Sequence, residues 1–288
     1  MSSRRRPCRA GFPLRRWPAL VLLVLALPVP TAGTTAPPCA PGRVSAGAPG
    51  PDACRAAPTR VRHRARTVPA TPHAGRPGED DPGYRHLGAY TRDEQAAVGA
   101  TLTVRDTGVR RRTDDFVATR LMARADTAGG TRWIEVGWTE DGWLDDNAQH
   151  VYTYDSSTGD WSYYDQFPVR DGDRIPVVIQ SGPARHGGTE WRAYLWWDRR
   201  WQLLAAPTLP FGPRAQVEQY VEVYVDPRRG GRYPVPAVTV SGVVVGRDPG
   251  GDAVPWREPE VATVTSPGYR GYCVDWRGRY DDWSAGTC

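Results

Sequence analysis

Between Gln216 and Asp226 the sequence alternates valine with glutamate and tyrosine, which places several carboxylates on one side of a strand. Because alternate residues of a strand share a face, the valines pack into a core while Glu218, Tyr220 and Glu222 line the opposite face. Carboxylates that meet in a groove can act as general acid and general base in hydrolysis. That face is a binding or catalytic surface if it lines a groove, and solvated surface if it forms the outside of a sandwich.

Another carboxylate, Glu135, stands in a strand-like segment with aromatic or apolar residues on both faces. Trp133 shares its face, and Trp138 lies on the other. Aromatic rings beside carboxylates in a groove suit an extended peptide or a sugar chain. Alternatively, Glu135 lies in a tryptophan-rich core and is held by an arginine such as Arg120 or Arg132. The aromatic candidates for ligand contact are Trp133, Tyr163, Tyr194 and Tyr220.

Short segments of alternating apolar and polar residues, separated by glycine, proline and aspartate, follow one another from about Gly88. No stretch has a persuasive 3.6-residue apolar period. The expected strands span residues 98–105, 115–123, 132–138, 149–155, 161–167, 174–180, 190–197, 200–205, 215–225 and 235–245. This pattern predicts an all-β fold, an antiparallel two-sheet β-sandwich of the jelly-roll type.

The basic residues, all of them arginine, are concentrated at the start of the chain. Arginines number 37 against 32 acidic residues, for a formal net charge of +5, but residues 80–288 alone carry −6. An arginine-rich stretch, an apolar core from Ala19 to Val29 and small residues have the layout of a secretory signal peptide. The apolar core is too short to span a bilayer of about 30 Å. We therefore expect a secreted protein that touches a membrane only through an uncleaved signal segment.

Composition divides the chain into four parts. Residues 1–36 are the expected signal peptide, and residues 88–250 the sandwich domain. Between them, residues 37–87 are rich in proline and arginine and have no apolar periodicity, which predicts a disordered linker or a pro-segment. Residues 251–288 are expected to form a C-terminal extension.

Four of the five cysteines form two local pairs, Cys39 with Cys54 and Cys273 with Cys288. An even number of cysteines in an exported chain predicts disulfides. Their spacing does not fit a zinc motif and the five histidines are scattered, so we expect neither a metal nor a cofactor.

Several other chemistries find no support in the residue types. The sequence contains no lysine, which excludes Schiff-base catalysis through a lysine. It contains no nucleophile-elbow or phosphate-cradling glycine motif. The short arginine clusters are expected to be solvated turns or linker, so no nucleic-acid partner is expected.

Two overlapping resemblances to known families follow from these segments. The run Trp133 to Trp138, followed by Asp145 to Tyr154, resembles the neprosin family, where an I-E-x-G-W strand precedes G-D-N-x-T-R-x-x-T-Y. Val217 to Val223 resembles that family's V-E-W-G-G-E-V stretch, with Gln-Tyr-Val in place of Trp-Gly-Gly. Trp161 to Val178 and Ala215 to Asp226 are similar to eqolisin-type glutamic peptidases.

These resemblances imply a concanavalin-like sandwich and acid-active peptide hydrolysis by a carboxylate pair or a Glu/Gln pair. By motif, Glu135 matches the first glutamate, and the second is Glu218 or, next in preference, Glu222. Gln149 and Gln166 are the candidates for an amide partner. A relative of the fold without peptidase activity is the alternative.

The sequence therefore predicts a secreted, monomeric sandwich that hydrolyses extended peptides in acid. The alternative is a non-catalytic domain that binds polysaccharide or another cell-wall polymer through its aromatic residues. Paired glutamates across such a groove also serve glycoside hydrolysis, in which the two carboxylates lie roughly 5–10 Å apart.

Overall fold

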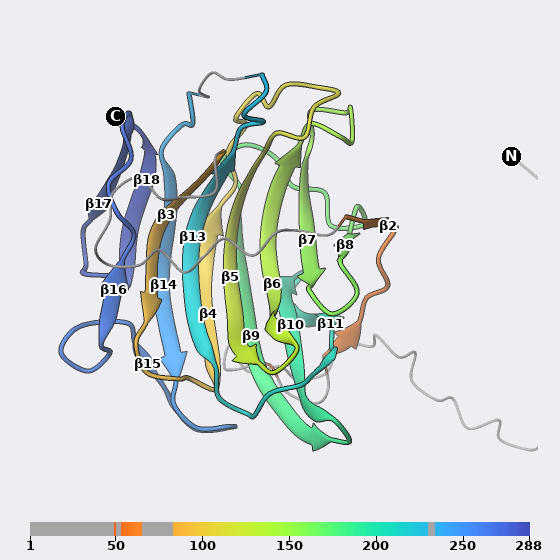
Figure 1. The fold of residues 1–288 in the computed structure, drawn as a ribbon, viewed down its shortest axis with the longest axis vertical. Helices are drawn as coiled ribbons and strands as arrows, with labels where there is room; N and C mark the ends of the chain where they lie inside the picture. Colours follow the sequence, from red (N-terminus) through yellow and green to blue (C-terminus); the bar gives the residue numbers. More distant parts are fainter. Residues whose placement is uncertain (1–48, 50–52, 65–82, 230–233) are drawn as a thin grey trace, which may run out of the picture. The chain divides into compact units, whose positions relative to one another are not determined.

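The protein folds into two β-sheets that pack face to face. The structure, a computed structural model, describes residues 49, 53–64, 83–229 and 234–288. In Figure 1 the strands of one sheet run across the front and those of the other lie behind them. The described residues contain strands and no helix, and hence no helix that is long and apolar enough to cross a membrane.

The first sheet has eight strands in the order β16-β3-β13-β5-β6-β7-β8-β2. Its strands are β2 (Arg60–His63), β3 (Tyr84–Thr91), β5 (Phe116–Thr127), β6 (Gly130–Asp141), β7 (Gln149–Asp155), β8 (Asp160–Tyr163), β13 (Gln216–Tyr224) and β16 (Thr263–Thr265). All neighbours in this sheet are antiparallel.

The second sheet has ten strands, eight of them in the order β1-β11-β10-β9-β4-β14-β18-β17, with β12 paired to β10 and β15 to β14. Its strands are β1 (Cys54–Arg55), β4 (Ala97–Thr103), β9 (Arg174–Arg185), β10 (Gly188–Trp197), β11 (Arg200–Ala205), β12 (Thr208–Leu209), β14 (Val238–Gly246), β15 (Ala253–Pro255), β17 (Tyr272–Trp276) and β18 (Asp282–Thr287). Only the short β1–β11 pair is parallel.

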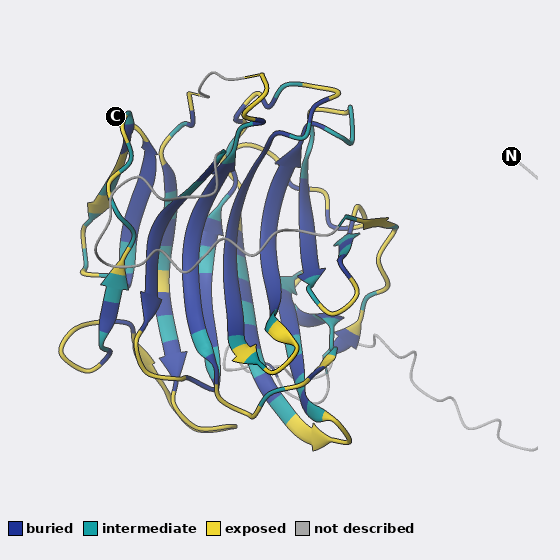
Figure 2. Cartoon of the chain, in the orientation of Figure 1, coloured by how far each residue is buried: buried dark blue, intermediate teal, exposed yellow. Residues whose placement is uncertain are grey.

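The core lies between the two sheets and is built from the alternating apolar residues of their inner faces. The valines of β13, Val217, Val221 and Val223, are fully buried there, as are apolar residues of β9 in the facing sheet. The outer face of β13 is buried as well, since Glu218 is 2% exposed and Glu222 0%. In Figure 2 the central strands of this sheet are coloured as buried along most of their length. Of the two alternatives for the outer face of β13, solvated surface is therefore wrong.

The predicted all-β sandwich is confirmed, and each of the ten expected strands has a counterpart in the structure. Strands at both ends of the chain were not expected. Strands β1, β2 and the start of β3 fall within residues 37–87, where proline and arginine hide the two-residue period. The residues after 250 add β15, β17 and β18 to one sheet and β16 to the other.

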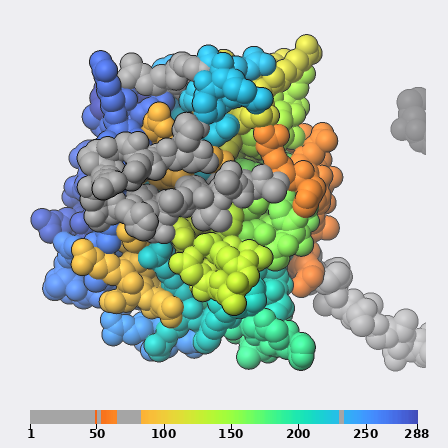
Figure 3. Space-filling model, viewed as in Figure 1, coloured from red at the N-terminus to blue at the C-terminus, as the bar shows by residue number. Residues whose placement is uncertain are grey.

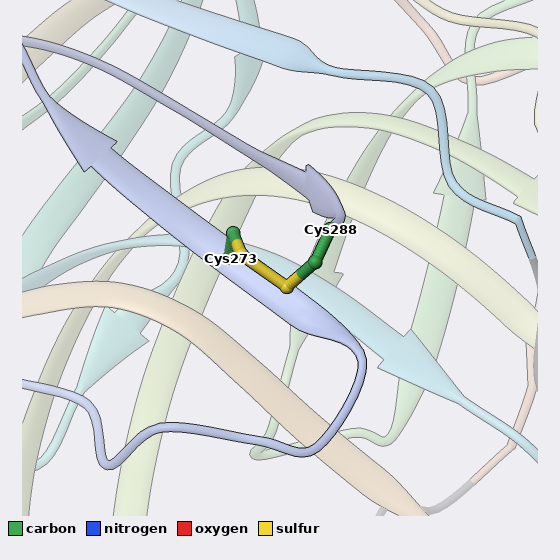
Figure 4. The surroundings of a disulfide bond; sticks show 2 residues. All are labelled: Cys273 and Cys288. Atoms are coloured by element: carbon green, nitrogen blue, oxygen red, sulfur yellow. A yellow bond between two sulfur atoms is a disulfide. The ribbon is translucent and has the colours of Figure 1, made fainter.

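A disulfide joins β17 to the last residue of the chain. Cys273 and Cys288 are bonded, as Figure 4 shows. Their Cα atoms lie 5.1 Å apart. This confirms the second predicted pair. In the first pair, Cys54 is buried in β1, while Cys39 lies outside the described residues, so the Cys39–Cys54 bond stays a prediction.

Removing the disulfide is expected to destabilise the sandwich. The bond closes a loop with a sequence separation of 15 residues, and closing a loop of that length lowers the entropy of the unfolded chain by an amount equivalent to about 3 kcal/mol. The double variant Cys273→Ser/Cys288→Ser should therefore unfold at a lower urea concentration, with the reduced wild type shifted equally. An unchanged midpoint would show that the bond does not constrain the unfolded chain.

Candidate functional site

The register of three neighbouring strands brings Glu135, Glu218 and Glu222 around one arginine. Strand β5 lies between β13 and β6, and Met122 of β5 is opposite Glu218 on one side and Glu135 on the other. Arg120 precedes Met122 by two residues, so both point to the outer face. Glu222 stands two outer-face positions beyond Glu218 along β13, opposite Ala118, so Arg120 lies between it and the other two glutamates.

The guanidinium of Arg120 contacts all three carboxylates. Its Nε donates to Glu222 Oε2 at 2.8 Å, and its Nη1 donates to Glu218 Oε2 at 3.3 Å. The same Nε lies 3.8 Å from Glu135 Oε1. Because both oxygens contact one nitrogen, the carboxylates of Glu135 and Glu222 lie within about 7 Å of each other, a separation used by paired catalytic carboxylates. The four side chains are at most 3% exposed.

Two of the carboxylates have further donors of different kinds. Glu135 accepts hydrogen bonds from the indole Nε1 of Trp133 at 2.7 Å and from the hydroxyl of Tyr152 at 2.9 Å. Glu218 accepts from Nη1 of a second arginine, Arg124, at 3.4 Å. Glu135 is thus held mainly by neutral donors, whereas Glu218 is held by cationic ones.

Two buried polar groups beside the cluster have no hydrogen-bond partner among the described residues: Nε2 of His86 and the hydroxyl of Tyr220. The His86 nitrogen lies 3.6 Å from Glu222 Oε1, and the ring of Tyr220 lies under the guanidinium of Arg120, 5.3 Å away. Burial, followed by the negative charge of Glu218, raises the pKa of Tyr220 well above its usual value. The phenol is therefore a donor across the whole acidic and neutral range.

Glycines allow the backbones of neighbouring strands to approach closely in the central row of the cluster. Tyr220 lies opposite Gly88, and Arg120 opposite Gly137. A Cβ on Gly137 would come within 1.9 Å of a backbone carbonyl of β5, and one on Gly88, whose φ is +150°, within 2.1 Å of a carbonyl of β13. Both positions therefore require glycine.

The structure brings only some of the predicted ligand-contacting residues to this cluster. Trp133 and Tyr220 belong to it. Tyr163 lies on the same outer face, two strands beyond β6, where its hydroxyl accepts from the indole of Trp143 at 3.0 Å. Tyr194 belongs to the ten-stranded sheet and packs against Trp201. It cannot contact a ligand at the glutamates.

Neither glutamine suggested as an amide partner reaches the glutamates. Gln149 donates to the buried Glu140 at 3.1 Å, on the inner face of β6. Gln166 follows β8 and donates to the carbonyl of Ala57 at 2.8 Å. The structure therefore places neither glutamine beside Glu135 as an amide partner.

Sequence reasoning considered Arg120 and Arg132 as partners of Glu135, and only Arg120 contacts it. It missed Arg124, His86 and Tyr152. The signal for Arg124 was present, since the charged residues of the otherwise apolar β5 segment stand an even number of positions apart, on one face. His86 and Tyr152 lie on other strands, β3 and β7, and only the order in which the strands pair places them beside the cluster.

In the described ranges, no group of three or more His, Cys, Asp or Glu side chains is arranged to hold a metal ion. A cavity of about 560 Å³ opens on the ten-stranded sheet over β4, β9 and β14, with Trp201 and Pro49 among its walls. Its lining is mostly apolar, with Asp248 and Asp252 as the carboxylates that line it. The glutamates around Arg120 are the better candidate site for catalysis because three carboxylates contact one buried arginine there.

The structure is similar to solved structures of glutamic peptidases. No protein-family model and no curated protein matches the sequence. Two complexes of scytalido-glutamic peptidase with transition-state analogues are 13% and 11% identical, each with a TM-score of 0.45 and coverage of 72% of this chain and 99% of theirs. SCP-B, a member of the eqolisin family in complex with the tripeptide Ala-Ile-His, is 12% identical at a TM-score of 0.44, with the same coverage. The likeness concerns the fold alone.

Replacing Arg120 should strongly destabilise the protein. Arg120→Met leaves three buried carboxylates without their shared cation, and breaking a buried ion pair in this way costs about 3–5 kcal/mol. Arg185→Met removes a half-exposed partner of Glu190 in the other sheet and should cost at most about 1 kcal/mol. Urea unfolding measures both, and equal losses would show that Arg120 does not hold the cluster together.

Proposed function

We propose that this protein is a secreted, acid-active endopeptidase of the glutamic type, with its catalytic site at the glutamate cluster. One observation carries the proposal: Glu135, Glu218 and Glu222 converge on Arg120 at a single face of the sheet. Carboxylates this close can share protons, so that one acts as base while another acts as acid. Neither the acid role nor the base role of a carboxylate requires a metal or a cofactor.

The contacts of each carboxylate suggest a division of roles. Glu218 contacts two arginines at 3.3 Å and 3.4 Å, and because such neighbours favour the charged form of a carboxylate, it is the general base that takes a proton from the attacking water. Glu135, which accepts from the neutral Trp133 and Tyr152, is the general acid that in its protonated form donates to the leaving amine. Glu222, with its shorter 2.8 Å bond, anchors Arg120.

Tyr220 supplies the remaining element, a donor for the carbonyl oxygen of the scissile bond. Its hydroxyl is buried beside Arg120 without a hydrogen-bond partner among the described residues. As negative charge develops on the carbonyl oxygen, a preorganised donor stabilises it most in a site that excludes water. Arg120 adds positive charge on the same side.

Substrate binding requires movement at this face. The three carboxylates and Tyr220 are at most 2% exposed, so a peptide reaches them only when the groups that bury them shift. The same burial argues against a polysaccharide platform, which needs exposed ring faces, because Trp133 and Tyr152 are buried too.

Two features support the proposal that the protein is secreted. The leading arginines, apolar core and small residues have the layout of a signal peptide. The Cys273–Cys288 disulfide suits an oxidising compartment outside the cytosol.

Hydrolysis of a peptide mixture at pH 3–5 tests the proposal. Glu135→Gln and Glu218→Gln should each lower kcat/KM by about 10²–10⁴-fold, because each removes one proton-transfer group. Glu190→Gln is the matched control, since Glu190 is an ion-paired glutamate of the other sheet, away from the cluster. Mass spectrometry of the products reports cleavage. If both cluster variants cleave as fast as Glu190→Gln, the proposed site is wrong.

Tyr220→Phe should separate catalysis from stability. Loss of a single oxyanion donor lowers kcat by about 10²–10³-fold, whereas removing a hydroxyl that has no hydrogen-bond partner among the described residues should leave the free energy of unfolding unchanged or raise it slightly. Wild-type kcat in the variant would remove Tyr220 from the mechanism. Tyr194→Phe, in the other sheet, serves as the control.

A further inference from the structure

A short arginine-rich strap closes one edge of the eight-stranded sheet. Residues 59–64, which include β2, lie antiparallel to β8, with Val61 opposite Ser162. Figure 3 shows this part of the chain, in orange, at the surface on the right of the view. The Thr59 amide donates to the carbonyl of Tyr163 and the Arg64 amide to that of Gly159, both at 2.8 Å.

Little apolar surface holds the strap in place. Three of the four residues of β2 are exposed, and its one large apolar side chain, Val61, is 53% exposed. A segment with few buried apolar contacts opens at a low free-energy cost compared with the core. Its attachment therefore depends on polar and ionic contacts.

Arg60 makes the densest set of these contacts. Its Nη2 donates to Asp165 Oδ1 at 2.9 Å, and its Nε lies 2.8 Å from Asp165 Oδ2. Its Nη1 donates to Asp146 at 3.3 Å. Thr59 Oγ1 donates to Asp165 Oδ2 at 2.8 Å, and the aromatic ring of Tyr163 lies 5.6 Å from the guanidinium. Asp165 is thus the main anchor of the strap.

His150 of β7 adds a second proton-sensitive group beneath Arg60. Its Nδ1 lies 2.9 Å from Asp165 Oδ1 and 3.1 Å from Nη2 of Arg60, and its Nε2 lies 3.2 Å from Asp146 Oδ1. In the neutral ring Nδ1 can accept from Arg60 while Nε2 donates to Asp146. A protonated ring donates from both nitrogens, so it repels Arg60 and competes with it for Asp165.

Of the other charged groups of the strap, Arg62 is exposed, and His63 and Arg64 form surface pairs. His63 lies 3.2 Å from Asp160, and Arg64 lies 2.7 Å from Asp114 and stacks over Trp143. The His63 side chain is 73% exposed, so its pair with Asp160 contributes little.

We propose that the strap is an acid-sensitive latch: residues 59–64 stay on the edge of β8 at neutral pH and detach from it in acid, while the sandwich remains folded. Because β8 is the only neighbour of β2 in the described sheet order, detachment exposes the edge of β8. The proposal goes beyond the peptidase function and does not depend on it.

The sign of the pH dependence follows from the two aspartates. Burial alone would raise the pKa of Asp165, but the hydrogen bonds from Arg60 and Thr59 outweigh it and hold the pKa below the usual range. Burial likewise opposes the contacts from His150 and Arg60 that lower the pKa of Asp146. Carboxylates with a lowered pKa stabilise the attached strap above their ordinary pKa of about 3.9, and this contribution disappears as the pH falls through the lowered value.

Hydrogen exchange of the intact chain, with labelling times corrected for the pH dependence of intrinsic exchange, tests the latch. Between pH 7 and pH 3, protection of strap amides should fall by about tenfold or more, while peptides from β5 and β6 stay protected. Asp165→Asn should release the strap already at pH 7. The matched control, Asp160→Asn, removes only the exposed pair with His63 and should behave as wild type.

A crosslinked variant, in which the strap cannot leave β8, tests whether the loss of protection in acid is due to detachment. Val61→Cys/Ser162→Cys, oxidised, ties the strap to β8 and should hold its protection constant across the pH range, with the reduced form behaving as wild type. The latch is refuted if wild-type strap protection is the same at pH 3 as at pH 7, or if the strap and β5 lose protection together. It is also refuted if Asp165→Asn matches Asp160→Asn at pH 7.

Discussion

Arg120 is a buried arginine in the middle of the eight-stranded sheet, and the buried carboxylates on the outer face of that sheet are arranged around it. Three glutamates from two flanking strands point toward its guanidinium, and in its absence all three would lose their shared counter-charge. The glycines opposite Arg120 and Tyr220 let the backbones of neighbouring strands approach closely there. The cluster thus follows from strand register, because a one-residue slip of β5 would turn Arg120 into the core.

The two faces of this sheet are stabilised by different kinds of interaction. Its inner face is an apolar core whose valines pack against the facing sheet, and that packing fixes the register. Its outer face uses that register to hold charged and aromatic groups with little exposure. The strap at the edge is held differently again, by ion pairs over little apolar surface. Core, cluster and strap therefore respond to different perturbations: cavity formation, loss of a counter-charge, and protonation.

The sandwich could be predicted because its inner strands keep a clear two-residue period, as in Gln216 to Asp226. Strands β1, β2 and β17 could not, because they are short edge strands whose partners, not their sequences, make them strands. Placing Glu135 with Glu218 and Glu222 was within reach, since each shares its face with aromatic residues. Gln149 was misplaced because alternation defines two faces of β7 but does not say which of them faces the core. Tyr194 was misplaced because alternation does not say to which sheet a strand belongs.

The central claim is that Glu135 and Glu218 act together on one substrate in acid. A double-mutant cycle on kcat/KM for peptide cleavage at pH 3–5 measures this most directly, with Glu135→Gln, Glu218→Gln and the double variant, each confirmed as folded. Residues that act as one unit show strongly non-additive losses. The account predicts that the double variant is hardly slower than either single variant. Losses that multiply, or single variants as active as the wild type, would contradict it.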